Sequence, residues 1–214
     1  MPLSQYATHS LLPDIARCHM ASFPASFSTR LGLAYNIKSL EWFLAGDNRF
    51  LFCIQEDGKV MAYCGGYQSR GTGDGSTSGM MQHAMKEAAI GMLKKPWLFF
   101  HKDVIKFYPL IFKNIARKLS PRKKNAAVIK PVNTRPAATG LVVIGVHPAY
   151  RGKGYFELLM QSFECESSKR GVSQMILSVR ADNARAIAAY KKMGWLTSLQ
   201  TEKVLEMCKT LQDA

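Results

Sequence analysis

The stretch that most constrains the fold is 141–163, where an apolar run, a basic loop and an amphipathic pattern follow one another. Leu141–Val146 is continuously apolar, which is typical of a buried strand. The run stops at His147-Pro148, and the loop Arg151-Gly152-Lys153-Gly154 follows. Apolar residues then recur at helical spacing, at Phe156, Leu159, Met160 and Phe163. The segment therefore predicts a strand, a cationic loop and a helix, in that order.

The loop has the chemistry of an anion site. The first turn of a helix leaves backbone N–H groups unpaired and carries the positive end of the helix dipole. Gly152 and Gly154 let an anion approach the backbone closely, while Arg151 and Lys153 add charge. Together these features predict a pyrophosphate site. The patterns G-x-x-x-x-G-K-S/T and G-x-G-x-x-G are both absent from the loop, so it is neither of those two nucleotide-binding motifs.

A second group of residues lies in 175–195, which reads MILSVRADNARAIAAYKKMGW. Asn183 is a natural helix N-cap after a strand and a turn. Tyr190 lies two helical turns later and shares one face with Asn183. That face is expected to point toward the carboxyl ends of two parallel strands, where open α/β sheets bind ligands. The alternatives are a simple cap for Asn183 and a core aromatic for Tyr190.

The remaining pattern predicts the other elements by residue range. Strand–helix–strand–helix order near the end of the chain predicts at least one parallel strand pair. The histidines have no metal-ligand spacing, so no metal site is expected. The expected strands are 3–9, 49–55, 60–67, 141–146, 175–179 and 196–208; the expected helices are 11–20, 30–45, 152–170 and 184–192; the expected loops are 65–79 and 120–137; a helical but irregular pattern covers 80–119.

Positive charge is concentrated in one part of the chain. The formal net charge is +14, and residues 71–136 hold 13 Lys/Arg against 3 Asp/Glu. Such an excess predicts an anionic partner, and the alternative is a solvated basic surface. Aromatic residues among the lysines of 80–119 also fit a peripheral membrane contact, against the alternative of a helical insertion that packs on the domain. No nucleic-acid-binding motif is present, so no nucleic-acid partner is expected.

Cysteine usage and the N-terminal sequence indicate the cytoplasm. The five cysteines are scattered without a C-x-x-C, which fits reduced thiols that each act as small core residues. Cys165 and Cys208 are expected to be structural. No signal-peptide pattern and no apolar run of about 20 residues is found.

Residues 138–195 resemble the GNAT superfamily of N-acetyltransferases. The resemblance rests on V-x-P-x-Y-R-G-K-G and on L-S-V-x-x-x-N-x-x-A-x-x-x-Y-x-K-x-G-W, as these motifs stand here. It implies a mixed α/β (α+β) fold: a mostly antiparallel twisted sheet with flanking helices and a parallel central strand pair. Residues 1–214 would form one GNAT domain, with a basic, mainly helical insertion at about 70–136.

The resemblance also implies acetyl-CoA as the cofactor and a set of site residues. Backbone groups of Ile144 and Val146 would pair with the pantetheine arm, and the Val146 N–H would hold the oxyanion. Tyr190 would protonate the departing CoA thiolate. Phe156 departs from the usual Gly or Ala of the Q/R-x-x-G-x-G/A signature, which puts one close backbone approach to the pyrophosphate in doubt. The residues implied to hold the diphosphate and the adjoining pantetheine are Arg151, Gly152, Lys153, Gly154, Tyr155, Phe156 and Asn183.

The expected activity is transfer of an acetyl group from acetyl-CoA to a primary amine of a small molecule, which attacks directly in a ternary complex. Residues 21–32 are similar to GNAT members of bacterial surface-polysaccharide or amino-sugar pathways, which makes an amino sugar or sugar nucleotide a candidate acceptor. No general base is identified, and homodimer formation is left open. The alternatives are a non-catalytic CoA-binding or regulatory scaffold and a GNAT protein that docks on membranes.

Overall fold

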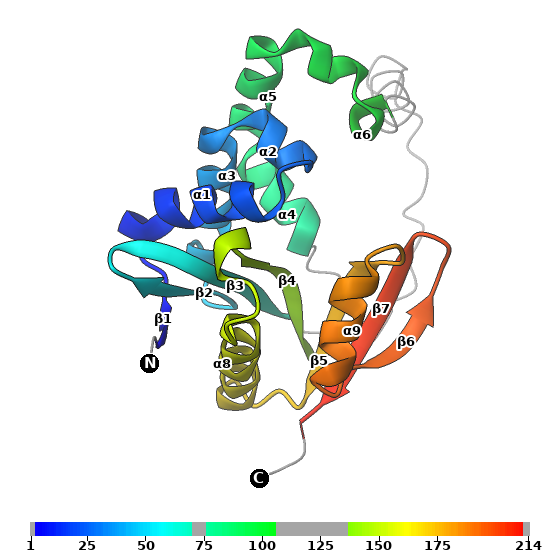
Figure 1. Ribbon diagram of the computed structural model, residues 1–214. Coiled ribbons are helices and arrows are strands. Elements are labelled where there is room, and N and C mark those ends of the chain that lie inside the picture. The colour runs from blue at the N-terminus through cyan, green and yellow to red at the C-terminus, as the bar shows by residue number, and fades with distance from the viewer. Residues whose placement is uncertain (1–2, 70–75, 106–136, 212–214) are drawn as a thin grey trace, which may run out of the picture.

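The computed structural model describes residues 3–69, 76–105 and 137–211, and its centre is a seven-stranded sheet (Figure 1). The strand order is β1-β2-β3-β4-β5-β7-β6. Only β4 and β5 pair in parallel, and all other neighbours are antiparallel. The strands are β1 (Ser4–Tyr6), β2 (Arg49–Glu56), β3 (Lys59–Ser69), β4 (Ala138–Val146), β5 (Gln174–Arg180), β6 (Leu196–Gln200) and β7 (Val204–Thr210).

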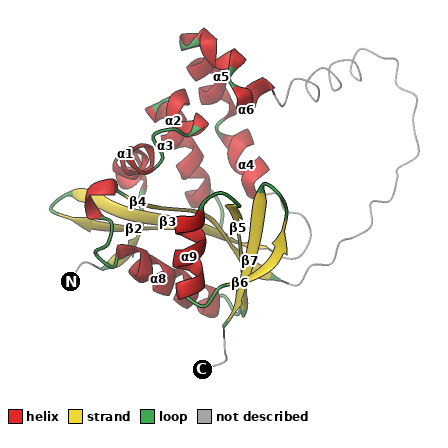
Figure 2. Cartoon of the chain, turned by 45° about the vertical axis from the view of Figure 1, so that its right-hand side comes forward, coloured by secondary structure: helices red, strands yellow, loops and turns green. Residues whose placement is uncertain are grey.

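Helices cover both faces of this sheet. In Figures 1 and 2, α8 and α9 lie on the opposite side of the sheet from α1 and α3. The α-helices are α1 (Leu12–Ser22), α2 (Phe27–Leu31), α3 (Leu33–Glu41), α4 (Ser76–His83), α5 (Met85–Lys94), α6 (Lys102–Ile105), α8 (Tyr155–Lys169) and α9 (Ala184–Lys192). The short 3₁₀ turns are η1 (His9–Leu11), η2 (Trp42–Leu44), η3 (Pro96–Phe100) and η4 (Pro148–Tyr150).

The expected fold class, a mostly antiparallel sheet with one parallel pair and flanking helices, is confirmed. Three details of the expected elements were wrong. The helix at 30–45 is divided, because Gly32 takes a left-handed φ of 103° between α2 and α3. The strand at 196–208 is a hairpin of two strands, β6 and β7. In the range 65–79, where a loop was expected, β3 continues to Ser69 and the helix α4 begins at Ser76.

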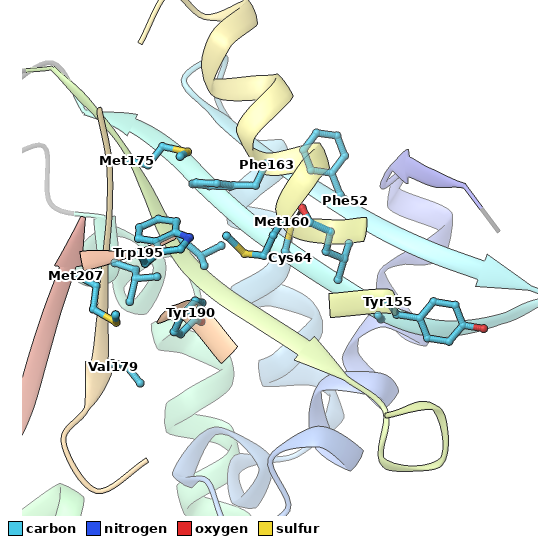
Figure 3. Packing of buried hydrophobic residues seen from close by; sticks show 14 of the residues in the cluster. Phe52, Cys64, Tyr155, Met160, Phe163, Met175, Val179, Tyr190, Trp195 and Met207 are labelled. Carbon is cyan, nitrogen blue, oxygen red and sulfur yellow. Dashed lines mark hydrogen bonds between the residues drawn. The ribbon is translucent and has the colours of Figure 1, made fainter. Parts of the chain in front are cut away.

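Alternation along β2 divides the core into two layers. Phe50, Phe52 and Ile54 face α8, whereas Leu51 and Cys53 face α1 and α3. A strand buried on both faces shows no polar alternation, which is why β2 reads as an unbroken apolar run. Figure 3 shows the α8 side of this core, where Phe163 and Met160 pack beside Phe52 and Cys64.

A bulge in β4 determines how the middle of the sheet opens. Val143 pairs with Gly65 and Leu141 with Gly66, so Val142 is an extra residue between them. Val142 and Val143 both pack against the α1 side. Successive residues of a regular strand point to opposite faces, so this arrangement marks the bulge. The parallel pairing of β4 with β5 ends at the same place, with Leu141 opposite Leu177. Beyond the bulge, β4 and β5 therefore separate.

The chain between the neighbouring strands β3 and β4 contains α4, α5, η3 and α6. The described part of this connection is helical, as the sequence predicts for the insertion, while the rest of the expected 80–119 pattern and most of the expected return loop lie outside the described residues. Ala84 and Leu98 are buried against Leu31 and Tyr35 of the α2–α3 pair. None of the described helices is long and apolar enough to cross a membrane.

The cysteine expectation is wrong in part. Cys18, Cys53 and Cys64 are buried as small core residues, and burial raises the pKa of the Cys18 thiol to about 11. Cys165 is exposed on α8 and Cys208 is half-buried. On β7 the neighbouring Met207 takes the buried position, so Cys208 lies on the other face of the strand.

We expect Gly66→Ala to destabilise the fold by about 1–3 kcal/mol, the usual range for overpacking. A Cβ at Gly66 would lie 2.6 Å from both the Phe163 and the Phe50 ring, and both rings are buried in the core. Urea denaturation measures the change. Gly46→Ala is the matched control, because its Cβ would meet nothing closer than 3.4 Å, and a loss as large as that of Gly66→Ala would contradict the packing argument.

Candidate active site

The separation of β4 from β5 opens a cleft of about 920 Å³. Its walls come from five parts of the chain that are far apart in sequence. They are β4 from Leu141 to Val146, the loop and helix start from Tyr150 to Glu157, the end of β5 from Leu177 to Arg180, α9 with its cap Asn183, and the α1–α2 corner from His19 to Ser26. The cleft lies at the carboxyl ends of the parallel strands, where the sequence places the ligand.

Beyond Leu141, the backbone of β4 presents to this cleft an edge that no other described strand pairs with. The His147 N–H donates to the Met61 carbonyl at 2.9 Å, which makes these two residues a hydrogen-bonded pair of the antiparallel ladder. Because pairs alternate along such a ladder, the N–H and C=O groups of Val146 and Ile144 point away from β3. They face the space that β5 has left. An extended ligand could pair with them as an added strand does.

Residues of the basic loop line the same opening. Gly152 and Gly154 have φ values of 78° and 82°, a left-handed conformation that suits glycine. The N–H groups of residues 152–157 donate to no acceptor among the described residues. Gly154 is the N-cap of the 15-residue helix α8 and supplies no side chain of its own. The geometry is thus that of an anion site, with free donors and the helix dipole together.

The side chains of the loop differ in what they do. The Arg151 guanidinium is already engaged, because its Nε donates to the Val146 carbonyl and its Nη2 to the Ser22 carbonyl, both at 3.3 Å. Arg151 therefore ties the loop to β4 and α1 as well as supplying charge. The Lys153 ammonium lies 5.3 Å from the centre of the Tyr150 ring. The sequence predicts that Arg151 and Lys153 add charge to the loop, and Arg151 in addition has these two carbonyl partners.

The first residues of α8 anchor the loop on two sides. The Tyr155 hydroxyl donates to Glu56 at 3.3 Å, which fixes the helix start to the β2–β3 hairpin. The Phe156 ring packs edge-on against Tyr190, with 5.6 Å between the ring centres. The large side chain at this signature position therefore lies against α9, while its N–H is among the free donors.

Asn183 caps α9, as the sequence predicts. Its Oδ1 accepts a hydrogen bond from the Ala186 N–H at 3.2 Å. The residue also lines the cleft. The cap occupies the oxygen, so a ligand could use the amide NH₂ as a donor.

Tyr190 is nearly buried, with 6% of its surface exposed, and still reaches the cleft wall. Its ring packs between Phe156 and Trp195, and Figure 3 shows it within the α8-side core, beside Val179. Desolvation raises the pKa of the Tyr190 hydroxyl well above its ordinary value. The core reading of this tyrosine is therefore correct, and a role in the cleft is compatible with it. The hydroxyl stays protonated at neutral pH.

The α1–α2 corner contributes a polar wall that sequence reasoning missed. The His19 ring hydrogen-bonds through Nδ1 to the Tyr63 hydroxyl at 2.5 Å and through Nε2 to Ser28 at 3.0 Å. Burial lowers the pKa of His19 to about 4, so the ring is neutral at pH 7. The Ser22 hydroxyl is buried without a partner among the described residues. Because these residues lie on a helix far from the motifs, spacing alone gave no sign that they face the cleft.

His147 behaves as a strand-end residue. Its Nδ1 accepts a hydrogen bond from the Ala149 N–H at 3.3 Å, which caps η4. Among the described residues, no three His, Cys, Asp or Glu side chains are gathered closely enough to hold a metal ion.

Comparison with known proteins gives one family. Residues 126–195 match the model of the acetyltransferase (GNAT) family. An acetyltransferase from Yersinia pestis is 37% identical over 54 residues, which are 25% of this chain and 38% of that protein. The chain therefore matches well under half the length of this relative.

Solved structures match over nearly the whole chain, at low identity. The ribosomal-protein-S18-alanine N-acetyltransferase from Escherichia coli has a TM-score of 0.57 at 16% identity, covering 100% of this chain and 96% of its own. The PaiA N-acetyltransferase from Thermoplasma acidophilum, solved in complex with coenzyme A, has a TM-score of 0.56 at 9% identity, covering 98% and 99%. These structures share the fold.

We expect the half-buried, neutral His19 to make stability depend on pH. The folded pKa is about 4 and the unfolded value about 6.5, so between them the unfolded chain binds a proton that the folded chain does not. The free energy of unfolding should fall as pH drops from 7 to 4, and the pKa difference of His19 should account for roughly 3 kcal/mol of that loss. Urea denaturation at pH 7 and pH 4 measures it.

His19→Gln removes the titration and keeps a hydrogen-bonding side chain. The variant should lose less stability between pH 7 and pH 4 than the parent protein. His9→Gln is the matched control at an exposed histidine. Equal pH slopes for His19→Gln and the parent protein would show that His19 is not held neutral by the fold.

Proposed function

We propose that this chain, a member of the GNAT superfamily by its signature segment and its fold, is an N-acetyltransferase that uses acetyl-CoA. The acceptor would be a primary amine that attacks the thioester directly in a ternary complex. The observation that carries the proposal is the coincidence of the open β4 edge and the free N–H groups of residues 152–157 in one cleft. A pantetheine arm and a diphosphate need these two features side by side.

Each part of acetyl-CoA would have its own set of residues along the cleft. The pantetheine arm would pair with the backbone of Ile144 and Val146, in the place that β5 leaves open. The diphosphate would accept hydrogen bonds from the N–H groups of Gly152, Lys153, Gly154, Tyr155 and Phe156. Arg151 would hold this loop in position through its two carbonyl contacts and add positive charge. The Asn183 amide would contact the pantetheine or the diphosphate.

The reacting atoms would lie where β4 and α9 meet. The Val146 N–H would stabilise the oxyanion of the tetrahedral intermediate. Tyr190 would protonate the CoA thiolate as it leaves. Burial makes Tyr190 a weaker acid, but the same burial destabilises a thiolate, so the difference between the two groups changes less than either pKa. Binding both reactants in one cleft removes the entropy cost of their encounter.

The acceptor half of the cleft would be formed by the α1–α2 corner. The neutral His19, the unpartnered Ser22 hydroxyl and Ser26 line it, and these groups suit an acceptor rich in hydroxyls. An amino sugar or sugar nucleotide fits this description. The S18-alanine N-acetyltransferase that shares the fold is named for a protein acceptor, so an N-terminal peptide belongs in the same substrate screen.

We expect acetyl-CoA to raise the melting temperature by about 5–10 °C at 100 times its dissociation constant. A ligand that binds only the folded state adds roughly 2.7 kcal/mol at that concentration, and about 2–4 °C per kcal/mol is usual for a chain of this size. Free CoA should act similarly and ATP should not. The absence of any shift at millimolar acetyl-CoA would favour a scaffold whose site the Phe156 side chain has closed.

We expect Tyr190→Phe to lower kcat by about 10²–10⁴-fold with little change in acetyl-CoA affinity, because the variant removes the proton-donating hydroxyl and keeps the ring packing. Release of the CoA thiol, with the best amine from a panel, measures the rate. Tyr67→Phe, on β3, is the matched control that removes a hydroxyl outside the cleft. Full turnover by Tyr190→Phe across the pH range would eliminate this residue as the general acid.

A further inference from the structure

The helix α5 has two apolar faces, and only one of them packs against other described parts of the protein. On the inner face, Ala88 packs against the Leu31–Tyr35 cluster, and a Cβ on Gly91 would lie 2.6 Å from the Leu31 carbonyl oxygen. The Lys95 ammonium donates to the Arg30 carbonyl at 2.8 Å. This side of α5 is therefore fixed closely on α2. Figure 1 shows α5 beyond α2 and α3, on their side away from the sheet.

The other face of α5 and the following turn η3 present large apolar side chains to solvent. We name this set the outer patch, and it consists of Met85, Ile90, Leu93, Trp97 and Phe100. Leu93 is 71% exposed, Trp97 64% and Phe100 80%. Isolated exposed apolar residues are ordinary, but five such residues within sixteen positions are not.

Lysines alternate with these apolar residues. Lys86 and Lys94 are exposed on α5, one turn before and one turn after Ile90. The side chain of Glu87, the acidic residue of α5, is half-buried. An exposed helix face and turn that carry Leu, Trp and Phe beside lysines have the composition of a segment that lies in the interface of an anionic membrane.

We propose that the outer patch docks the protein on an anionic lipid surface, with Leu93, Trp97 and Phe100 entering the headgroup region. A lipid interface suits the set better than a protein partner does. Charged residues are depleted from the buried centre of protein interfaces, whereas lysines beside an interfacial helix can reach the phosphates with their ammonium groups. Tryptophan is enriched at the membrane–water boundary, and the net charge of +14 attracts the chain toward such a surface. The docking needs no catalytic step.

The tryptophans provide a direct readout. The chain has three, and Trp42 and Trp195 are 3% and 1% exposed, so Trp97 is the exposed one. On addition of vesicles of phosphatidylcholine with about one third phosphatidylserine, an anionic lipid, we expect the fluorescence emission to shift to shorter wavelength. The protein should co-sediment with these vesicles and much less with pure phosphatidylcholine. Trp97→Phe should abolish the shift while the protein still sediments.

Matched variants separate the apolar and the electrostatic parts. Leu93→Glu should weaken vesicle binding at least about tenfold, whereas Leu196→Glu, at a residue 70% exposed on β6, should weaken it much less. Lys94→Ala should weaken binding about fivefold, against a smaller effect of Lys169→Ala on α8. Unchanged melting with acetyl-CoA in each variant shows that the fold and the cleft remain.

Three results would overturn the proposal. One is no sedimentation with anionic vesicles. Another is equal binding to neutral and anionic vesicles. The third is a dimer in analytical ultracentrifugation that Leu93→Glu dissociates while vesicle binding is unaffected, because the patch would then bind a second copy of the chain. Binding is measured without substrate, so these results do not depend on whether the protein is an acetyltransferase.

Discussion

The extra residue Val142 in β4 is the constraint on which the candidate site depends. The parallel pairing with β5 ends at Leu141, next to this extra residue. The extra residue also decides to which side the following backbone groups point, so that those of Ile144 and Val146 face the opening. Without the bulge, a continuous ladder would satisfy these groups within the sheet and leave no edge for a ligand. The glycines Gly65 and Gly66 opposite the bulge let the rings of Phe43, Phe50 and Phe163 approach the backbone there. Core packing and the cleft are therefore parts of one arrangement.

The two halves of the cleft use burial in different ways. At the basic loop, the backbone donors at the start of α8 have no partner among the described residues. At the α1–α2 corner, burial lowers the pKa of His19, and on α9 burial raises the pKa of the Tyr190 hydroxyl. Both side chains can therefore act as hydrogen-bonding groups without carrying charge at neutral pH. Arg151 joins the halves, because its guanidinium contacts both the β4 carbonyl and the end of α1.

Local patterns in the sequence were sufficient to predict the elements around the motifs. The run before His147, the glycines of the loop and Asn183 each act through the backbone nearby, so β4, α8 and α9 could be predicted from residues a few positions apart. The bulge could not be predicted, because every residue of Leu141–Val146 except Gly145 is a large apolar residue. The run therefore has no apolar–polar alternation that an extra residue would interrupt. His19 was also missed, since its place in the cleft depends on how α1 packs over β3 and β4. The helix expected over 30–45 is interrupted at Gly32, which takes a positive φ. The apolar spacing continues across Gly32, so the periodicity did not indicate this break.

The β3–β4 pair has a consequence for the order of folding. These strands are neighbours in the sheet, yet residues 70–137 separate them in the chain. In the unfolded chain, a connection of that length is about four doublings longer than a tight hairpin, which adds roughly 2.5 kcal/mol of closure entropy. The hairpins β2–β3 and β6–β7 need no such closure. The two halves of the sheet should therefore acquire structure separately, and the central seam beside the cleft should form last.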